Sequence, residues 1–252
     1  MLPYHDENQT LRTPLVTFGL IAASVGSWLL VQGAGSEYAL AASVCNLGLI
    51  PGELTASVAP GTGFPIGPGL VCQTDPGMQV SHLVSSMFLH GSWMHLLGNM
   101  WFLWLFGNNI EDSMTRPRFL AFYLLTGLAA ALAQVAADPS SAVPMVGASG
   151  AISGVMGGYL VLFPRVRVFT LIPLGFIFTT LALPAWVMLI YWAFLQFFGG
   201  ITSVVGEQEG GVAFWAHLGG FVAGVVLVKV FARRDRVAAH VSHDWRPRAT
   251  WR

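Results

Sequence analysis

The hydrophobic pattern of this chain is a series of long intervals without charged side chains, separated by short polar segments. A bilayer core of about 30 Å needs roughly 20 apolar residues per helix, and six intervals reach or approach that length. The pattern therefore predicts an all-α, polytopic membrane protein. Its six transmembrane helices are expected at about residues 14–33, 86–107, 118–137, 149–164, 184–204 and 211–231.

Charged residues are too few for a water-soluble protein of this size. Asp, Glu, Lys and Arg make up 10% of the 252 residues, against roughly 25% in ordinary soluble domains, and the mean hydropathy is +0.64. The 54% hydrophobic content excludes a disordered chain, and the formal net charge of +0 excludes a nucleic-acid binder. Composition and pattern together favour one integral membrane domain.

The distribution of the charges decides the helix count. With six spans, all 12 Lys and Arg fall on one side, which the positive-inside rule assigns to the cytoplasm together with both termini. A seventh helix would move the basic tail across the membrane, so we expect residues 171–183 to be an interfacial or cytoplasmic-side segment. The basic residues are Arg12, Arg116, Arg118, Arg165, Arg167, Lys229, Arg233, Arg234, Arg236, Arg246, Arg248 and Arg252, and the acids of the other side are Glu37, Glu53, Asp75, Asp138, Glu207 and Glu209.

The chain divides into three expected parts. Residues 1–13 form a short cytoplasmic N-terminus without the features of a cleavable signal peptide, and residues 14–231 form the membrane domain. Its external loop, residues 34–85, is punctuated by Pro and Gly and is expected to pack on or into the membrane face. Residues 232–252 form a basic cytoplasmic tail, which we expect to be solvated and partly disordered.

Both cysteines, Cys45 and Cys72, lie in the external loop. On the oxidising side of a bacterial membrane, two cysteines in one loop favour a disulfide. Two free thiols, buried as small hydrophobic groups, are the alternative, and the sequence leaves both open.

The second span opens with polar side chains that are costly to bury in a bilayer and are therefore candidate functional residues. His95 and Asn99 share a helix face at a spacing of four, and His90 lies nearer the outside. Taken alone, this cluster is also compatible with hydrogen bonds that only pack neighbouring helices.

The fourth span opens with Ser149 between the small residues Gly147, Ala148 and Gly150. Small neighbours let a substrate approach the serine backbone. A helix from here to about residue 163 covers roughly 21 Å, less than the bilayer core of about 30 Å, so Ser149 should lie below the outer surface. The helix N-terminus there offers unpaired N–H groups.

Stripes of small residues predict that the fourth and sixth spans pack closely. Ser149 directly precedes one stripe, and His217 directly follows the first member of the other. Packing the stripes together would bring the two side chains within hydrogen-bond reach. The stripes are Gly150, Gly154 and Gly158 in the fourth span and Ala216, Gly220 and Gly224 in the sixth.

A serine beside a histidine is a nucleophile–base pair for acyl transfer. His217 would accept the proton of Ser149. Asn99 and His95, at a comparable depth, would donate to the developing oxyanion together with the Ser149 N–H. The predicted spans contain no Asp or Glu, so a dyad is expected rather than a triad.

In these motifs the sequence resembles the rhomboid family of intramembrane serine proteases. The resemblance covers about residues 14–231 and rests on three motifs in one order. They are FLHGSWMHLLGN at 88–99, GASG at 147–150 and AHLGGFVAG at 216–224.

The resemblance implies a six-helix core, a Ser149–His217 dyad and an oxyanion hole from Asn99, His95 and the backbone of Ser149 and Ala148. It implies hydrolysis of peptide bonds in or near transmembrane segments of other membrane proteins, within the lipid bilayer. It also implies no metal, no cofactor and no obligatory protein partner. The further residues that it marks as supporting are His90, Gly147, Gly150, Gly220, Gly224 and Glu111, the last with a structural role on the cytoplasmic side.

The chain departs from the family in one respect. Many rhomboids carry a Trp-Arg pair in the first loop, and residues 34–85 contain neither Trp nor Arg. We therefore expect this loop to dock through other apolar contacts. The resemblance favours the inner membrane of a bacterium, with the active site on the extracytoplasmic side.

Two other functions compete with proteolysis. A catalytically silent rhomboid-like protein would bind membrane helices for quality control, although retention of Ser149, His217 and Asn99 argues against it. A small transporter is disfavoured because the sequence has no internal repeat and no intramembrane carboxylate for ion coupling.

Overall fold

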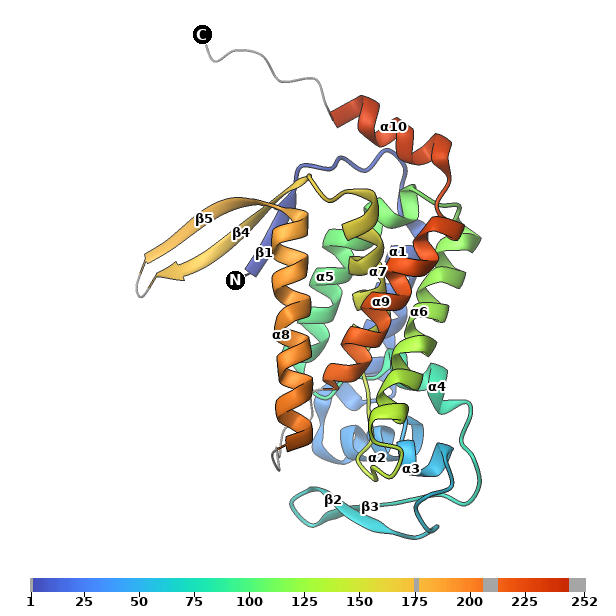
Figure 1. The fold of residues 1–252 in the computed structure, drawn as a ribbon. Coiled ribbons are helices and arrows are strands. Elements are labelled where there is room, and N and C mark those ends of the chain that lie inside the picture. Colours follow the sequence, from blue (N-terminus) through green and yellow to red (C-terminus); the bar gives the residue numbers. More distant parts are fainter. Residues whose placement is uncertain (1, 175–176, 206–212, 245–252) are drawn as a thin grey trace.

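Six long helices form a bundle in the computed structural model, which describes residues 2–174, 177–205 and 213–244 (Figure 1). The helices coincide with the predicted spans, with boundaries that differ by several residues. Glu207, Glu209 and the basic residues Arg246, Arg248 and Arg252 lie outside the described residues. The six helices are α1 (Leu15–Leu30), α5 (Trp93–Asp112), α6 (Arg116–Ala137), α7 (Ser149–Leu162), α8 (Ala185–Val205) and α9 (Phe214–Phe231).

Helices of the described residues differ in how well they match a bilayer. Three are long and apolar enough to cross it, namely α6, the part of α8 over Ala185–Thr202, and α9. Helices α1 and α7 are apolar but shorter. Large apolar side chains such as Trp186, Phe194 and Phe197 are exposed on α8, as expected for a helix face that meets lipid rather than water.

Helix α7 occupies the middle of the bundle, where it contacts α5, α6, α8 and α9 (Figure 1). Its residues from Gly150 to Tyr159 are buried. Large side chains with almost no exposed surface, including Phe106, Phe122 and Tyr159, fill the space around it. In a bilayer such groups stabilise the bundle through van der Waals packing rather than through removal of apolar surface from water.

The fold is mostly helical rather than purely all-α, because the described parts of the segment 171–183, residues 171–174 and 177–183, lie in two paired strands. These strands, β4 (Arg167–Leu174) and β5 (Ile177–Pro184), pair antiparallel, and β1 (Leu2–Asp6) adds to β4. Figure 1 shows this sheet projecting from one side of the bundle. Thr, Ile and Phe recur here and favour strands, but hydropathy alone does not separate a short apolar strand from a helix.

The external loop, residues 34–85, is a folded segment at the opposite end of the bundle from that sheet (Figure 1). A two-stranded antiparallel sheet and several short helical elements take the place of an irregular loop. The elements of this segment and its borders are η1 (Gly33–Gly35), α2 (Glu37–Leu47), α3 (Pro51–Leu54), β2 (Gly63–Gly67), β3 (Leu70–Gln73) and α4 (His82–Ser85), followed directly by η2 (Ser86–Phe88).

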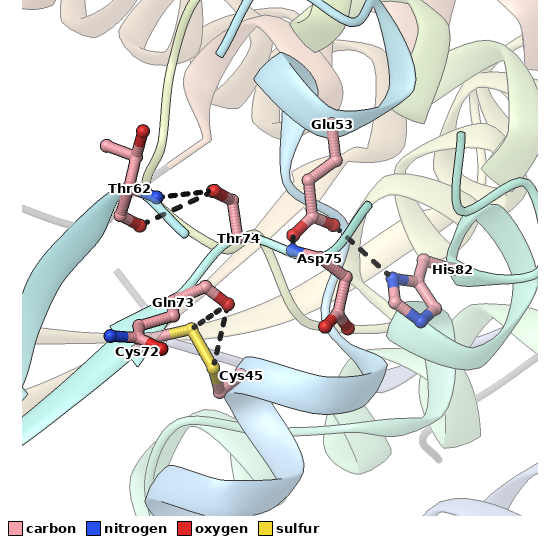
Figure 2. Close-up of a disulfide and its surroundings, with 8 residues drawn as sticks. All are labelled: Cys45, Glu53, Thr62, Cys72, Gln73, Thr74, Asp75 and His82. Atoms are coloured by element: carbon pink, nitrogen blue, oxygen red, sulfur yellow. Dashed lines mark hydrogen bonds and ion pairs between the residues drawn. A yellow bond between two sulfur atoms is a disulfide. The ribbon is translucent and has the colours of Figure 1, made fainter. Parts of the chain in front are cut away.

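A disulfide between Cys45 and Cys72 ties α2 to β3, as Figure 2 shows. Nearby, the buried Glu53 carboxylate accepts the Asp75 N–H at 2.7 Å and lies 4.0 Å from His82 Nδ1 (Figure 2). Burial raises the pKa of Glu53 above its usual value, and the hydrogen bond from the Asp75 backbone opposes that shift. Covalent and polar contacts thus hold this loop together.

The tail, expected to be partly disordered, contains the helix α10 (Arg234–Asp244). Its buried His240 lies 3.0 Å from Asn8 Oδ1 and 3.2 Å from Asp112 Oδ2. Asp112 also accepts a hydrogen bond from Arg12 Nη1 at 2.8 Å. Figure 1 shows α10 and the chain N-terminal to α1 lying across the same end of the bundle. Both terminal segments are therefore anchored to the end of α5.

Candidate active site

The first residue of α7 and a residue of the first turn of α9 meet at the loop end of the bundle. Ser149 Oγ lies 2.7 Å from His217 Nε2, and both side chains are partly buried. This separation is a hydrogen bond of the length expected between a nucleophile and its base. The arrangement can transfer a proton from the serine hydroxyl to the imidazole.

Close packing of the predicted glycine stripes produces this contact. A methyl group added at Gly220 would lie 2.0 Å from the Gly150 carbonyl oxygen, and one at Gly224 would lie 1.9 Å from that of Gly154. Only glycine lets the backbones of α7 and α9 approach so closely. The stripes therefore fix the distance between the helices that carry Ser149 and His217.

The other ring nitrogen of His217 contacts a residue that the sequence analysis did not single out. His217 Nδ1 lies 2.8 Å from Gln196 Oε1 on α8, and the Trp192 ring, one turn earlier on α8, lies 6.0 Å from the imidazole. A lone Gln in an apolar span was the available signal. The usual third member of a Ser–His site is a carboxylate, which the predicted spans lack, and an amide in that role carries no sequence pattern of its own.

His95 on α5 faces the chain just before the serine. The Gly91 N–H donates to His95 Nδ1 at 3.3 Å, which leaves the proton of a neutral ring on Nε2. A methyl group added at Gly147 would lie 2.8 Å from that Nε2, and Gly147 has a φ of 132°. Both facts require glycine at this position. His95 is thus placed to present an N–H donor close to Ser149.

Asn99, one turn after His95 on α5, is 7% exposed, and among the described residues its Nδ2 has no hydrogen-bond partner. A buried amide donor without an acceptor costs free energy, roughly 1–3 kcal/mol. Such a donor is suited to an acceptor that is present only during a reaction. The first N–H groups of α7, which have no partner within the helix, are donors of the same kind.

His90 holds the start of α5 through two contacts. Its backbone N–H and carbonyl bond the Gln32 side chain at 2.8 Å each, and its ring meets the His95 ring edge-on at a centroid distance of 5.2 Å. Gln32, at the end of α1, is a second residue that the sequence analysis missed. These contacts position His95.

The remaining predicted residues lie away from the dyad. Glu111 accepts hydrogen bonds from Val16 N, Thr17 N and Thr17 Oγ1 at the first turn of α1, so it caps that helix at the opposite end of the bundle. The Cys45–Cys72 disulfide belongs to the external loop. Within the described residues, no group of three or more His, Cys, Asp or Glu could hold a metal ion.

Comparisons with known proteins identify the family of this chain. The family model described as Rhomboid domain matches residues 77–234. The chain is 30% identical over 148 residues to Rhomboid protein 1, mitochondrial, of Saccharomyces cerevisiae, covering 57% of this chain and 40% of that protein. It is 30% identical over 155 residues to Rhomboid-like protease 5 of Toxoplasma gondii, covering 59% and 16%.

A shorter match of 78 residues, 36% identical, relates the chain to the putative rhomboid protease YdcA of Bacillus subtilis, covering 31% of this chain and 39% of that protein. The matches thus span less than half of the length of these relatives. The family model nevertheless covers more than half of this chain, including Ser149, His217, His95 and Asn99. The chain therefore belongs to the rhomboid family of integral membrane proteins.

Proposed function

We propose that this protein is an intramembrane serine endopeptidase with Ser149 as nucleophile and His217 as general base. The observation that carries the proposal is the 2.7 Å contact between Ser149 Oγ and His217 Nε2. Two relatives that are named as rhomboid proteases, one of them as a putative one, also support the proposal.

The reaction begins when His217 Nε2 accepts the proton of Ser149 as Oγ attacks the scissile carbonyl carbon. The tetrahedral intermediate collapses, the carbon–nitrogen bond breaks, and the imidazolium gives its proton to the departing amine. Water, activated by the neutral His217, then hydrolyses the acyl-enzyme and releases Ser149. The step needs neither metal nor cofactor.

The negative charge on the carbonyl oxygen is stabilised by donors on α5 and α7. We assign this role to Asn99 Nδ2, His95 Nε2 and the backbone N–H groups of Ser149 and Ala148. The unpartnered Asn99 Nδ2 supports the assignment, as does the place of the His95 ring against Gly147. Removal of one such donor lowers kcat by about 100-fold, so we expect that loss in Asn99→Ala.

The proposal includes six membrane spans, cytoplasmic termini and a site near the external face of a bacterial inner membrane. The dyad lies at the bundle end that carries the folded loop of residues 34–85, and the arginines Arg12, Arg116 and Arg236 gather at the other end. The positive-inside rule orients such a molecule. Substrates are transmembrane proteins, whose helix must unwind locally because a helical peptide bond is shielded by its own hydrogen bonds.

The test is cleavage of a model single-pass membrane protein by the purified protein in liposomes. Wild type should cleave, whereas Ser149→Ala and His217→Ala should not. Ser140→Ala, which changes an exposed serine of the preceding segment, is the matched control and should cleave like wild type. Binding of several substrates without cleavage would instead favour the catalytically silent alternative.

A further inference from the structure

The amide of Gln196 completes a chain of three side chains from three helices. Its Oε1 lies 2.8 Å from His217 Nδ1, and His217 Nε2 lies 2.7 Å from Ser149 Oγ. We propose that Gln196 is a positioning residue that holds His217 in the Nδ1–H tautomer, so that Nε2 is free to accept the serine proton. This inference rests on the proposed function and assigns its base a third, uncharged member.

The hydrogen-bonding chemistry of the His217 imidazole and of the Gln196 amide oxygen supports this tautomer. A neutral imidazole carries its proton on one nitrogen, and the partner of the other nitrogen selects which one. The amide oxygen of Gln196 can only accept, so the hydrogen bond requires an N–H at His217 Nδ1. In the opposite tautomer, Nε2–H would point at Ser149 Oγ and could not take its proton.

An amide suits this place better than a carboxylate would. Among the described residues, no Asp or Glu forms a hydrogen bond or ion pair with His217. A buried carboxylate carries a large desolvation cost when it is not fully paired. The Gln196 oxygen provides the acceptor without that cost. Its partial charge also favours the imidazolium that forms when Ser149 is deprotonated.

Side chains of α8 restrict the orientation of the His217 ring and also select which of its nitrogens carries the proton. Trp192 and Gln196 are four residues apart and therefore share one face of α8. The Trp192 ring lies 6.0 Å from the His217 ring and 5.9 Å from Phe221, one turn further along α9. The ring contact limits rotation of the imidazole while the amide selects the tautomer. Helix α8 therefore orients the base and selects its tautomer, whereas α7 positions the nucleophile.

Two variants separate the role of the acceptor from mere packing. Gln196→Leu replaces the amide with an apolar side chain of similar size and so removes the acceptor, whereas Gln196→Glu keeps an acceptor oxygen. Loss of one hydrogen bond that orients the base should lower kcat roughly tenfold at unchanged KM, and Gln196→Glu should retain more activity. Thr202→Val removes an exposed hydroxyl of the same helix that bonds the Gly199 carbonyl, and this control should match wild type.

The tautomer itself is measured by ¹⁵N NMR of protein with labelled histidine, with His217→Ala used to assign the signals. Wild type and Gln196→Glu should show Nδ1 of His217 protonated and Nε2 unprotonated, and Gln196→Leu should show a mixture. An unchanged tautomer and unchanged kcat in Gln196→Leu would overturn the inference. Because the NMR signal does not depend on turnover, absence of cleavage by wild type would refute the proposed function alone.

Discussion

Replacing Gly220 with alanine should separate the dyad without changing either of its members. The new methyl group would lie 2.0 Å from the Gly150 carbonyl oxygen, whereas ordinary contact begins at 3.4 Å. Helices α7 and α9 must therefore move apart by about 1.4 Å at this point. Because His217 is one turn away, the 2.7 Å bond to Ser149 Oγ should be lost.

The size of the effect follows from this displacement. Misplacing a catalytic group by about 1 Å costs about 100-fold in rate, so kcat/KM of Gly220→Ala should fall by at least that factor. Overpacking of a close helix contact costs roughly 1–3 kcal/mol of stability. Without the clash, alanine in a helix would instead stabilise the protein by about 0.5–1 kcal/mol.

Cleavage of the model substrate and the thermal unfolding midpoint are measured on the same preparations. Gly26→Ala on α1 is the matched control, since an added methyl group there meets nothing within 4 Å. The control should cleave like wild type with an equal or higher midpoint. If Gly220→Ala also cleaved at the wild-type rate, the stripes would not set the distance between Ser149 and His217, and the packing argument would be wrong.

The external loop and the anchor of the N-terminus provide three more tests. Replacing Cys45 and Cys72 with serine opens a cross-link of sequence separation 27 and should destabilise the loop by about 3 kcal/mol; equal protease resistance would contradict this. The raised pKa of Glu53 implies loop stability that is full at low pH and lost as the pH rises through that pKa. Glu53→Gln should therefore flatten the pH dependence of loop hydrogen exchange, and an unaltered profile would count against the burial argument. Tyr159→Phe removes the hydroxyl that donates to Asp6 at 2.5 Å and should lower the unfolding free energy by about 1–3 kcal/mol, so an unchanged midpoint would show that this bond adds nothing.

Hydropathy and glycine spacing predicted most of the bundle and the meeting of Ser149 with His217. The reason is physical: bilayer thickness limits where helices lie, and a stripe such as Gly150–Gly154 leaves few ways to pack against Gly220. The same sequence did not reveal the strands of residues 167–174 and 177–184. Apolar runs of that length satisfy helix and strand patterns alike, and only the pairing of the two strands with each other and of β4 with β1 resolves them.

Side-chain contacts between residues that are distant in sequence could not be predicted from the sequence patterns either. Gln196 and His217 are 21 residues apart on different helices, and although each is a polar residue in an apolar span, no spacing in the sequence joins the two. The anchoring of His240 by Asn8 joins residues 232 positions apart. Such contacts depend on how helices and terminal segments pack in three dimensions. The periodicity of a single segment does not specify that packing.

The most direct test of the dyad is to react the protein with a fluorophosphonate and locate the adduct by mass spectrometry. Wild type should be modified at Ser149 alone, because among the described residues this is the one hydroxyl bonded to a histidine ring nitrogen. His217→Ala should remain unmodified while its unfolding midpoint stays close to that of wild type. Modification of Ser149 at the same rate in folded His217→Ala, or no modification of wild type, would contradict the account.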